Sequence, residues 1–547
     1  MATYGIDLGT TYCAVSRVDP QRSTEPVPVQ FDDGGAFPSL VLLAPGRNGP
    51  RAVVGAKARQ EYAKLVGRRF EAPTGVHLIR GAKNHIGRVA DGGDEQGPPW
   101  ITEGVEFTAT DVSALILRAL RRRVEAQNLP AMERVVVTHP QKFRNLQRIA
   151  TQQAAELAGL HVLGILTEPD AAAWAYEHAQ PSNSPRKSVV FDFGGGTLDV
   201  VLMETSRDAV GRLTTRVVAS NGAACGGLEI DQQITEQLLL RYSKEIGDTL
   251  DVGDLRAKAR DEFMTHAERI KRRLNTADAA HDPDWREQVK WVEFEGFEEH
   301  PPARFAVELG ELSDWITGVL ERAMETLRGA LNKGGWKIHD VDAVRMTGQS
   351  SLLVAMRKRI EQEFDRRRVA LEHDPNSYLH PATIVASGAA VYGHQMLQSP
   401  DNASVLVRGA IPETISFTSR LSPAHAKVAI FEGIPAGTPT PARMIRLFGL
   451  NVDGKSLPDG GCTLPIEVFE GASHTPIGAY RLTFEKPLRH DDDIEIALEF
   501  ATNGRFSMKV RYGEEFREAR LTEAECILDQ TALQTRRALL ANMELEA

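Results

Sequence analysis

A carboxylate stands on each side of a three-glycine turn in the middle of the chain. Asp192 precedes glycines 194–196, and Thr197 and Asp199 follow them, between two apolar runs typical of strands. Glycines leave no Cβ atoms in the turn, so a ligand can approach the backbone, and successive N–H groups in such a turn form a concave anion site. Carboxylates repel phosphate unless a divalent cation lies between them, so this grouping predicts a site for Mg²⁺-nucleotide. The alternative is a glycine-rich hairpin with incidental acidic residues.

A second copy of this pattern opens the chain. Asp7, Gly9 and the hydroxyl residues Thr10, Thr11 and Tyr12 lie between two further strand-like runs. Duplication of a phosphate-binding hairpin predicts two similar lobes that clamp one nucleotide between them. The two hairpins resemble the phosphate loops of the actin, sugar-kinase and heat-shock ATPase fold. Further motifs resemble those of the DnaK-type chaperones, the seventy-kilodalton heat-shock family.

The motif that separates this chain from actin and the sugar kinases lies on a helix expected over residues 254–274. Glu268, Lys271, Arg272 and Asn275 are spaced i, i+3, i+4 and i+7, so they project together from one face of that helix. Alone, such a face is most often a solvated surface with ion pairs. In the family, a Glu-x-x-Lys-Arg-x-x-polar face contacts the adenosine, and the resemblance implies that role here.

The resemblance also implies a set of catalytic residues. Lys83 matches the lysine that reaches the γ-phosphate as a mobile point charge, although one more surface lysine is the alternative. Glu168 directly precedes Pro169, a good first residue of a helix, and either lies near the attacking water or complements the helix dipole. With Thr197 and Asp199, these residues would position the water and its proton for in-line attack.

Two further segments resemble the parts of the family that relay nucleotide state between domains. The strand expected to end at Pro140 is followed by Arg148, and His139 stands where the family has an apolar residue. A short apolar stretch resembles the interdomain linker, with Arg408 where an acid is usual. The alternatives are that Pro140 simply terminates its strand and that the apolar stretch is an edge strand. The residues expected to relay the signal are Pro140, Arg148, Val405, Leu406 and Val407.

The second adenosine loop departs from the family pattern. The usual double glycine is Thr347-Gly348, and Ser351 replaces the arginine that stacks on adenine in relatives. A lost cation–π contact is worth roughly 0.5–2 kcal/mol. We therefore expect weaker ATP binding than in typical relatives. The loop before Gly227 is one residue shorter than in the family and lacks its acidic pair.

Composition limits the classes of partner and compartment. The chain has 547 residues, 42% hydrophobic and 25% charged, as expected for a soluble protein with more than one domain. Its net charge of -10 disfavours nucleic acid or an anionic membrane as the main partner. The four cysteines are scattered, no apolar run reaches membrane-spanning length, and no signal peptide precedes the first strand. These features predict a reducing, cytoplasmic location.

The region after the linker is predicted to be rich in strands. Regularly spaced turns between short apolar runs suggest a β-sandwich of the peptide-binding type, although a generic β-sandwich is an alternative. One amphipathic helix is expected from Thr522 to Leu545. It would correspond to the first lid helix of the family, so peptide would be held briefly.

These observations predict an α/β actin-like ATPase domain over 1–396, an interdomain linker over 397–410, a β-sandwich over 411–520 and a truncated lid helix over 521–547. The expected cofactors are ATP or ADP with Mg²⁺, held mostly through water by Asp7 and Asp192. The residues expected to contact the nucleotide are Gly9, Thr10, Thr11, Tyr12, Gly194, Gly195, Gly196, Thr197, Gly227, Glu268, Lys271, Arg272, Asn275, Gly348, Gln349, Ser350 and Ser351.

The resemblance implies a slow ATPase whose turnover is coupled to binding of an unfolded or specific client polypeptide. A J-domain co-chaperone and a nucleotide-exchange factor are possible partners; nucleic acid and membrane are not expected. Two alternatives stay open, because fold alone does not determine function. One is a nucleotide-gated scaffold with little turnover that serves one partner, and the other is a small-molecule kinase of the same fold.

Overall fold

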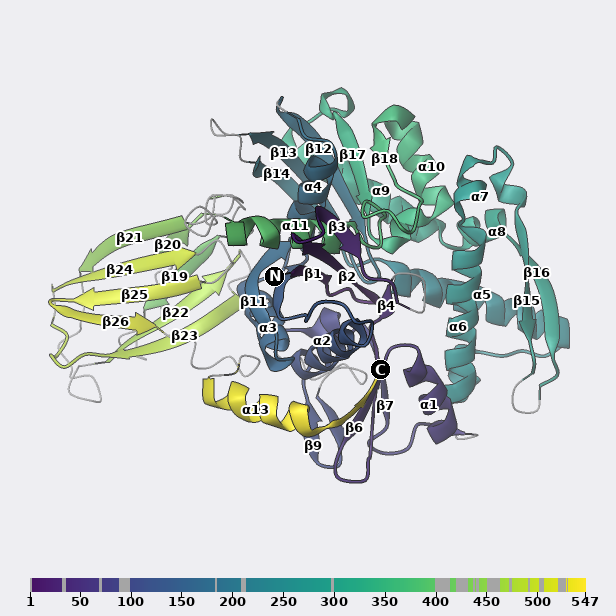
Figure 1. Cartoon of the computed structure of the whole chain (residues 1–547), viewed down its shortest axis with the longest axis horizontal. Coiled ribbons are helices and arrows are strands. Elements are labelled where there is room, and N and C mark those ends of the chain that lie inside the picture. The colour runs from purple at the N-terminus through teal and green to yellow at the C-terminus, as the bar shows by residue number, and fades with distance from the viewer. Residues whose placement is uncertain are drawn as a thin grey trace.

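Two α/β lobes pack against each other, with a β-rich domain to one side (Figure 1). The computed structural model describes residues 2–31, 36–67, 71–87, 99–182, 184–207, 213–296, 300–398, 414–419, 431–435, 438, 442–449, 463–471, 475–489, 492–500, 506–519, 528 and 530–547. Among them, no helix is both long enough and apolar enough to cross a membrane.

The sheet of lobe I has the strand order β11-β10-β1-β2-β3. β1, β10 and β11 are parallel, whereas β2 pairs antiparallel with β1 and β3. The central strands are buried, as their near-continuous apolar runs predict. The strands are β1 (Thr3–Asp7), β2 (Tyr12–Asp19), β3 (Ser23–Pro28), β10 (Arg134–His139) and β11 (His161–Thr167).

Lobe II repeats this arrangement with the order β14-β13-β12-β17-β18. An antiparallel hairpin again continues into a parallel pair, so the duplication expected from the two glycine-rich motifs is a duplication of topology. The strands are β12 (Arg186–Phe193), β13 (Leu198–Arg207), β14 (Leu213–Ala223), β17 (Ala343–Thr347) and β18 (Val369–Ala370).

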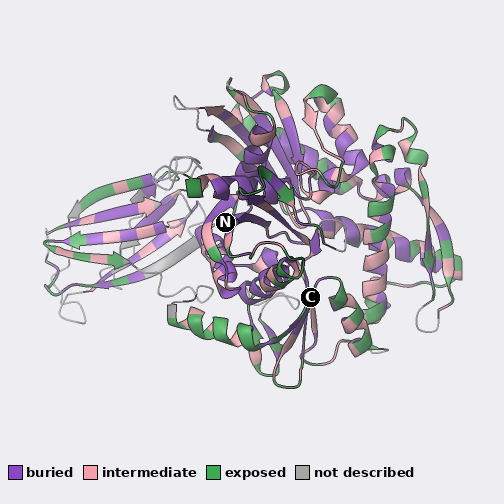
Figure 2. Cartoon of the chain, in the orientation of Figure 1, coloured by how far each residue is buried: buried purple, intermediate pink, exposed green. Residues whose placement is uncertain are grey.

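Helices α4 (Glu168–Ala179) and α11 (Ile384–Gln398) pack between the two sheets. α4 contacts strands of both sheets, and α11 contacts α4 and β1. Gly388 makes this close approach possible, because a Cβ atom there would lie 1.7 Å from the backbone oxygen of Ala171. The central strands of both sheets are mostly buried (Figure 2).

Each lobe carries an additional subdomain. Lobe I adds a small sheet with the order β27-β6-β5-β7, and lobe II adds two long helices and the β15–β16 hairpin. These elements are β5 (Leu40–Ala44), β6 (Arg51–Val54), β7 (His77–Arg80), β27 (Glu544–Glu546), α1 (Lys57–Val66), α5 (Gly227–Ile246), α6 (Ala257–Leu274), β15 (Val289–Phe294) and β16 (Ala303–Glu308).

The β-rich domain consists of two four-stranded antiparallel sheets with the orders β20-β19-β22-β23 and β21-β24-β25-β26. Buried residues of both sheets, including Phe417, Val468, Leu498 and Met508, form one core between them. The strands are β19 (Ile415–Ser419), β20 (Phe431–Ile434), β21 (Ala442–Gly449), β22 (Thr463–Glu470), β23 (Thr475–Thr483), β24 (Asp493–Phe500), β25 (Phe506–Tyr512) and β26 (Glu515–Ala519).

The last part of the chain differs from the single helix expected up to Leu545. Helix α13 spans Gln530–Asn542, and residues Glu544–Glu546 form strand β27, paired in parallel with β6. Glu-Leu-Glu alternates polar and apolar residues with the period of a strand, and β6 offers an edge to pair with. Figure 1 shows α13 alongside lobe I rather than across the sandwich. The prediction of a helix reaching Leu545 is therefore wrong at its end; residues 521–527 lie outside the described part.

Candidate nucleotide site

The two glycine-rich turns face each other between the lobes. A Cβ atom on Gly195 would lie 2.1 Å from the hydroxyl oxygen of Thr11, and one on Gly196 would lie 3.0 Å from the methyl carbon of Thr10. The absence of side chains in the second turn is thus what lets it approach the first. The backbone of the turn between β1 and β2 in lobe I therefore lies next to the backbone of the turn between β12 and β13 in lobe II.

A buried lysine and three carboxylates lie directly beneath these turns. Lys83, in a short 3₁₀ helix (Ala82–His85), places its Nζ 2.5 Å from Oε1 of Glu168, the first residue of α4. Asp7 ends β1, and Asp192 stands next to last in β12, so the two sheets present them at matching positions. The chain therefore brings together the four residues that the motifs predicted separately.

Electrostatics in this cluster are dominated by burial. Burial raises the pKa of Asp7 and of Asp192 above the usual range, and the charge of Glu168 raises both further. Burial works against the charge of Lys83, but Glu168 and Asp7 outweigh it, so the pKa of Lys83 is raised. One lysine thus faces three carboxylates, and the cluster lacks positive charge.

This donor set suits Mg²⁺ carried by a nucleotide. Asp7 and Asp192 offer hard oxygen ligands in a site where burial, and then the charge of Glu168, raises the pKa of both carboxyl groups. Within the described residues, no group of three or more His, Cys, Asp or Glu side chains is placed to hold a metal by itself. Mg²⁺ commonly uses one or two carboxylates, several waters and substrate phosphates, which agrees with this geometry.

Thr197 and Asp199 lie at the start of β13, beside the cluster. The hydroxyl of Thr197 donates to Oδ2 of Asp199 at 3.4 Å, and Nζ of Lys142 lies 3.7 Å from Oδ1 of Asp199. Burial raises the pKa of Asp199 to about 6, and Lys142 acts in the opposite direction. Sequence reasoning missed Lys142, although it stands only two residues after Pro140.

The start of α5 joins the lobe II turn through backbone hydrogen bonds. The N–H of Gly227 donates to the carbonyl oxygen of Gly194 at 3.0 Å, and that of Leu228 to Gly195 at 2.7 Å. Ser350 adds its hydroxyl to the same Gly194 oxygen at 2.8 Å. Gly227 and Ser350 therefore support the turn in this conformation.

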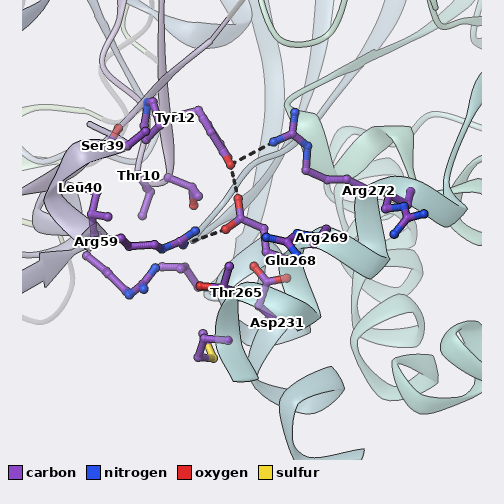
Figure 3. Close-up of a pocket in the computed structure, with 18 residues that line it drawn as sticks. Thr10, Tyr12, Ser39, Leu40, Arg59, Asp231, Thr265, Glu268, Arg269 and Arg272 are labelled. Atoms are coloured by element: carbon purple, nitrogen blue, oxygen red, sulfur yellow. Dashed lines mark hydrogen bonds and ion pairs between the residues drawn. The ribbon is translucent and has the colours of Figure 1, made fainter. Parts of the chain in front are cut away.

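A cleft of about 600 Å³ opens beside the turns and is lined by both lobes (Figure 3). On its lobe II side, Glu268 accepts hydrogen bonds from the hydroxyl of Tyr12 and, at 3.0 Å, from Arg59. The guanidinium carbon of Arg272 lies 5.5 Å from the centre of the Tyr12 ring. Arg59 was not among the residues expected from the sequence, because only the fold brings α1 across to α6.

The remaining residues expected to contact adenosine do not line this cleft. Lys271 pairs with Asp231 at 2.7 Å, and the Asn275 side chain accepts from the N–H of Val354 at 2.8 Å, where it caps helix α10 (Val354–Glu363). Ser351 is fully buried and donates to the carbonyl oxygen of Thr347 at 2.6 Å. In this conformation Ser351 therefore faces the interior.

The loop containing Gly348 and Gln349 lies against the lobe II turn. Gly348 has a positive φ of 77°, and a Cβ atom there would lie 2.7 Å from Oδ1 of Asp192. A glycine is required at this point for conformation and for space. The loop is thus adjacent to the carboxylate cluster.

Comparison with known proteins agrees with this geometry. A family model described as "Hsp70 protein" matches residues 3–418. The chain belongs to the Hsp70 family. The curated Heat shock 70 kDa protein BIP3 of Oryza sativa subsp. japonica is 28% identical over 548 residues, covering 95% of this chain and 74% of that protein. Hsp70 proteins are ATP-binding ATPases of the chaperone type, and the predicted actin-like ATPase fold followed by a β-rich domain and a helix is confirmed.

The sandwich of this Hsp70 contacts lobe I at helix α3 (Asn145–Leu157). Oε2 of Glu470, at the end of β22, accepts a hydrogen bond from the N–H of Asn145 at 2.9 Å. Burial lowers the pKa of Arg148, and the nearby charge of Glu470 opposes this shift. The charge of Glu470 in the β-rich domain therefore acts on Arg148. The relay role of Arg148 stays a prediction, and Glu470 and Asn145 were not foreseen from the sequence.

Pro140 and His139 complete this region. The carbonyl oxygen of Pro140 accepts the N–H of Phe143 at 3.1 Å and lies 2.8 Å from Nδ1 of His139. Burial lowers the pKa of His139 to about 3, so its ring is neutral at physiological pH. The predicted linker residues Val405, Leu406 and Val407 lie outside the described residues.

Proposed function

We propose that this Hsp70 binds Mg-ATP between its lobes and hydrolyses it slowly, and that hydrolysis is coupled to polypeptide binding by the β-sandwich. The observation that carries the proposal is the Lys83–Glu168 pair, which is buried between the two phosphate hairpins at 2.5 Å. A lysine held there by a carboxylate, next to Asp7 and Asp192, suits transfer of a phosphoryl group to water.

The chain's own residues divide the work of hydrolysis. Backbone N–H groups of residues 9–12 and 194–197 bind the phosphates. Lys83 supplies a positive point charge where negative charge develops. Glu168 and Asp199 orient the attacking water, and Asp199, with a pKa of about 6, is suited to accept its proton near neutral pH. Bound Mg²⁺ neutralises phosphate charge.

Coupling to the sandwich would use the contact at α3. Glu470 and Arg148 are oppositely charged groups at the interface between the two domains. A nucleotide can shift the equilibrium between two domain arrangements only to the extent that its affinities for the two arrangements differ. We propose that movement of α3 with the lobe I sheet changes the Glu470 contact and thereby the affinity of the sandwich for peptide.

Release of a fluorescent apolar peptide tests this proposal. Mg-ATP should accelerate peptide release relative to Mg-ADP in the wild-type protein. Thr197→Ala should bind Mg-ATP and release peptide faster. Because the hydroxyl beside Asp199 is missing, this variant should not hydrolyse the ATP and should not return to the release rate seen with Mg-ADP. Thr249→Ala, an exposed threonine far from the turns in the sequence, is the matched control. Equal release rates with ATP and ADP would contradict coupling.

A nucleotide-gated scaffold with little turnover is the second candidate. Ser351 in place of the stacking arginine favours it, since weaker ATP binding reduces steady cycling. One stoichiometric partner in a pulldown would support the scaffold, and many unfolded clients the chaperone. Family membership disfavours the small-molecule kinase. A cytoplasmic location and action of a J-domain protein or exchange factor stay predictions.

A further inference from the structure

The residues after the sandwich are incorporated into lobe I rather than merely lying on it. Strand β27 pairs in parallel with β6, in the register Glu544 with Arg51, Leu545 with Ala52 and Glu546 with Val53. Within the described part of the chain, β6 would otherwise be an edge of its sheet. The pairing satisfies backbone groups of that edge and adds a strand to the lobe.

The apolar side chains of this segment belong to the core of lobe I. Leu540, Met543 and Leu545 are 1%, 7% and 8% exposed, and they join the same hydrophobic cluster as residues of α2 (Ala109–Glu125) and α3. A segment that binds only transiently would bury less of its apolar surface, because that surface must be solvated each time the segment leaves.

An ion pair fixes the position of α13. Arg536 forms two hydrogen bonds to the nearly fully buried carboxylate of Asp111, at 2.7 and 2.8 Å, and stacks on the ring of Phe107. Such a two-pronged contact is both strong and geometrically specific.

Arginines of α2 donate hydrogen bonds to backbone carbonyl groups at the other end of the segment. Arg118 donates to the carbonyl oxygens of Leu540 and, at 2.6 Å, Ala541, and Arg122 donates to that of Leu545 at 2.8 Å. The last carbonyls of a helix have no partner within the helix, so Arg118 serves as the cap of α13, whereas Arg122 holds strand β27.

A further contact lies upstream of α13. The backbone of Leu528 both donates to and accepts from the side chain of Gln153 on α3, at 3.0 and 2.5 Å. The contacts named here therefore all involve α2, α3, β6 and their neighbours in lobe I. None of these partners is among the residues that we assign to the nucleotide.

We propose that residues 528–547 form a permanent strap on lobe I, which stays bound in every nucleotide state and limits how far the sandwich can move. Because strand β27 and the apolar side chains of the strap are part of a sheet and the core of lobe I, the strap should move together with α3 and that lobe, so ATP and ADP should leave its contacts in place. This inference goes beyond the proposed function, and the strap is measurable without nucleotide.

The strap restricts the sandwich by simple chain length. Eight residues lie between Ala519, the end of β26, and Leu528, so nine Cα–Cα steps join the two. Fully extended, they span about 30 Å, so the exit of the sandwich remains within about 30 Å of Gln153. The entry side is connected by the residues between Gln398 and Thr414. These two connections, one at each end of the sandwich, keep its effective concentration near lobe I high. The sandwich is therefore favoured to rebind lobe I through the contact between Glu470 and Asn145.

Hydrogen exchange read by mass spectrometry tests the strap in the full chain. The amides of β27 should exchange slowly, with rates that agree within about twofold without nucleotide, with Mg-ADP and with Mg-ATP. Loss of this protection in either nucleotide state would overturn the proposal. Failure to bind nucleotide at all would instead contradict the proposed function, while the nucleotide-free rate would still report on the strap.

Two neighbouring arginines provide matched variants. Arg536→Ala removes the pair with Asp111, whereas Arg537→Ala removes the same charge from an exposed position on the next residue. Exchange of β27 should accelerate about tenfold or more in Arg536→Ala and stay within twofold of wild type in Arg537→Ala. Equal behaviour of the two variants would contradict the assignment. Leu545→Asp, which places a charge in the core contact, should give the same acceleration as Arg536→Ala.

Small-angle X-ray scattering then tests the mechanical consequence. The radius of gyration of the wild-type protein should change by less than about 1 Å between Mg-ATP and Mg-ADP, and Leu545→Asp should expand in Mg-ADP. Wild-type protein that expands in Mg-ADP as far as Leu545→Asp would show that the strap does not restrain the sandwich.

Discussion

The carboxylate of Glu470 accepts a hydrogen bond from the backbone N–H of Asn145 at 2.9 Å, which joins the end of β22 in the sandwich to the first turn of α3 in the ATPase domain. Both residues are buried, so the contact excludes water. It places a negative charge at the positive end of a helix and near the guanidinium of Arg148. The first prediction follows from this pair.

Glu470→Gln should weaken communication between the domains without impairing the nucleotide site. Glutamine can still accept from Asn145 but carries no charge to oppose Arg148, so stimulation of ATP hydrolysis by peptide should fall several-fold while the basal rate is retained. Steady-state hydrolysis over a peptide titration measures both. Glu467→Gln, on the same strand, is the control and should behave as wild type. Unchanged stimulation in Glu470→Gln would remove this contact from the coupling route.

Lys83→Met should reduce the single-turnover rate of ATP hydrolysis about 100- to 1000-fold, because it removes the buried positive charge that pairs with Glu168 beside the phosphate hairpins. Nucleotide should still bind, since the backbone N–H groups of both turns remain. Lys64→Met, at an exposed lysine, serves as control. A variant that hydrolyses within threefold of wild type would show that Lys83 is only a structural partner of Glu168.

Arg272→Met should weaken ATP binding about 2- to 6-fold. Its guanidinium lies over Tyr12 at the wall of the proposed nucleotide cleft, and an exposed cation–π contact is worth about 0.5–1 kcal/mol. Titration with a fluorescent ATP analogue measures the affinity. Arg366→Met, an exposed arginine outside the cleft, should leave it unchanged. Equal affinities in both variants would exclude Arg272 from the base site.

His139→Leu should make the protein less sensitive to acid. The pKa of His139 is about 3 in the folded protein and near 6.5 when unfolded, so between these values the unfolded chain binds more protons and stability falls as the pH is lowered from 6.5. From pH 7 to pH 5, His139 alone should cost the wild type about 2 kcal/mol of unfolding free energy.

Urea unfolding at pH 7, 6 and 5 measures this difference between wild type and His139→Leu. Other groups titrate in both proteins, including Asp199, whose raised pKa has the opposite sign of effect, so they cancel in the comparison. Parallel pH dependences of the two proteins would contradict a buried, neutral His139.

Local sequence patterns were sufficient for the parts of the site that lie within one turn or one helix. The two hairpins, the spacing of Glu268 and Arg272, and the position of Glu168 before Pro169 all depend on residues close in the chain, where period and turn chemistry determine geometry. The structure confirms these elements, and it brings Lys83 to Glu168 across 85 positions.

Contacts between distant segments could not be predicted in the same way. Glu470 meets Asn145 across 325 positions, Arg59 meets Glu268 across 209, and β27 pairs with β6 across nearly the whole chain. A short Glu-Leu-Glu segment is compatible with the end of a helix as well as with a strand. The edge of β6 beside this segment determines that it forms a strand, and the local sequence does not indicate that β6 lies there.

Single-turnover hydrolysis of Mg-ATP, with and without an unfolded apolar peptide, tests the central claim most directly, with Thr197→Ala as the inactive reference. The account predicts slow hydrolysis in the wild-type protein, several-fold acceleration by peptide, and no hydrolysis by Thr197→Ala in either condition. ATP that binds but is not turned over would contradict the ATPase and leave a switchable scaffold. Hydrolysis that ignores peptide would contradict coupling between the lobes and the sandwich.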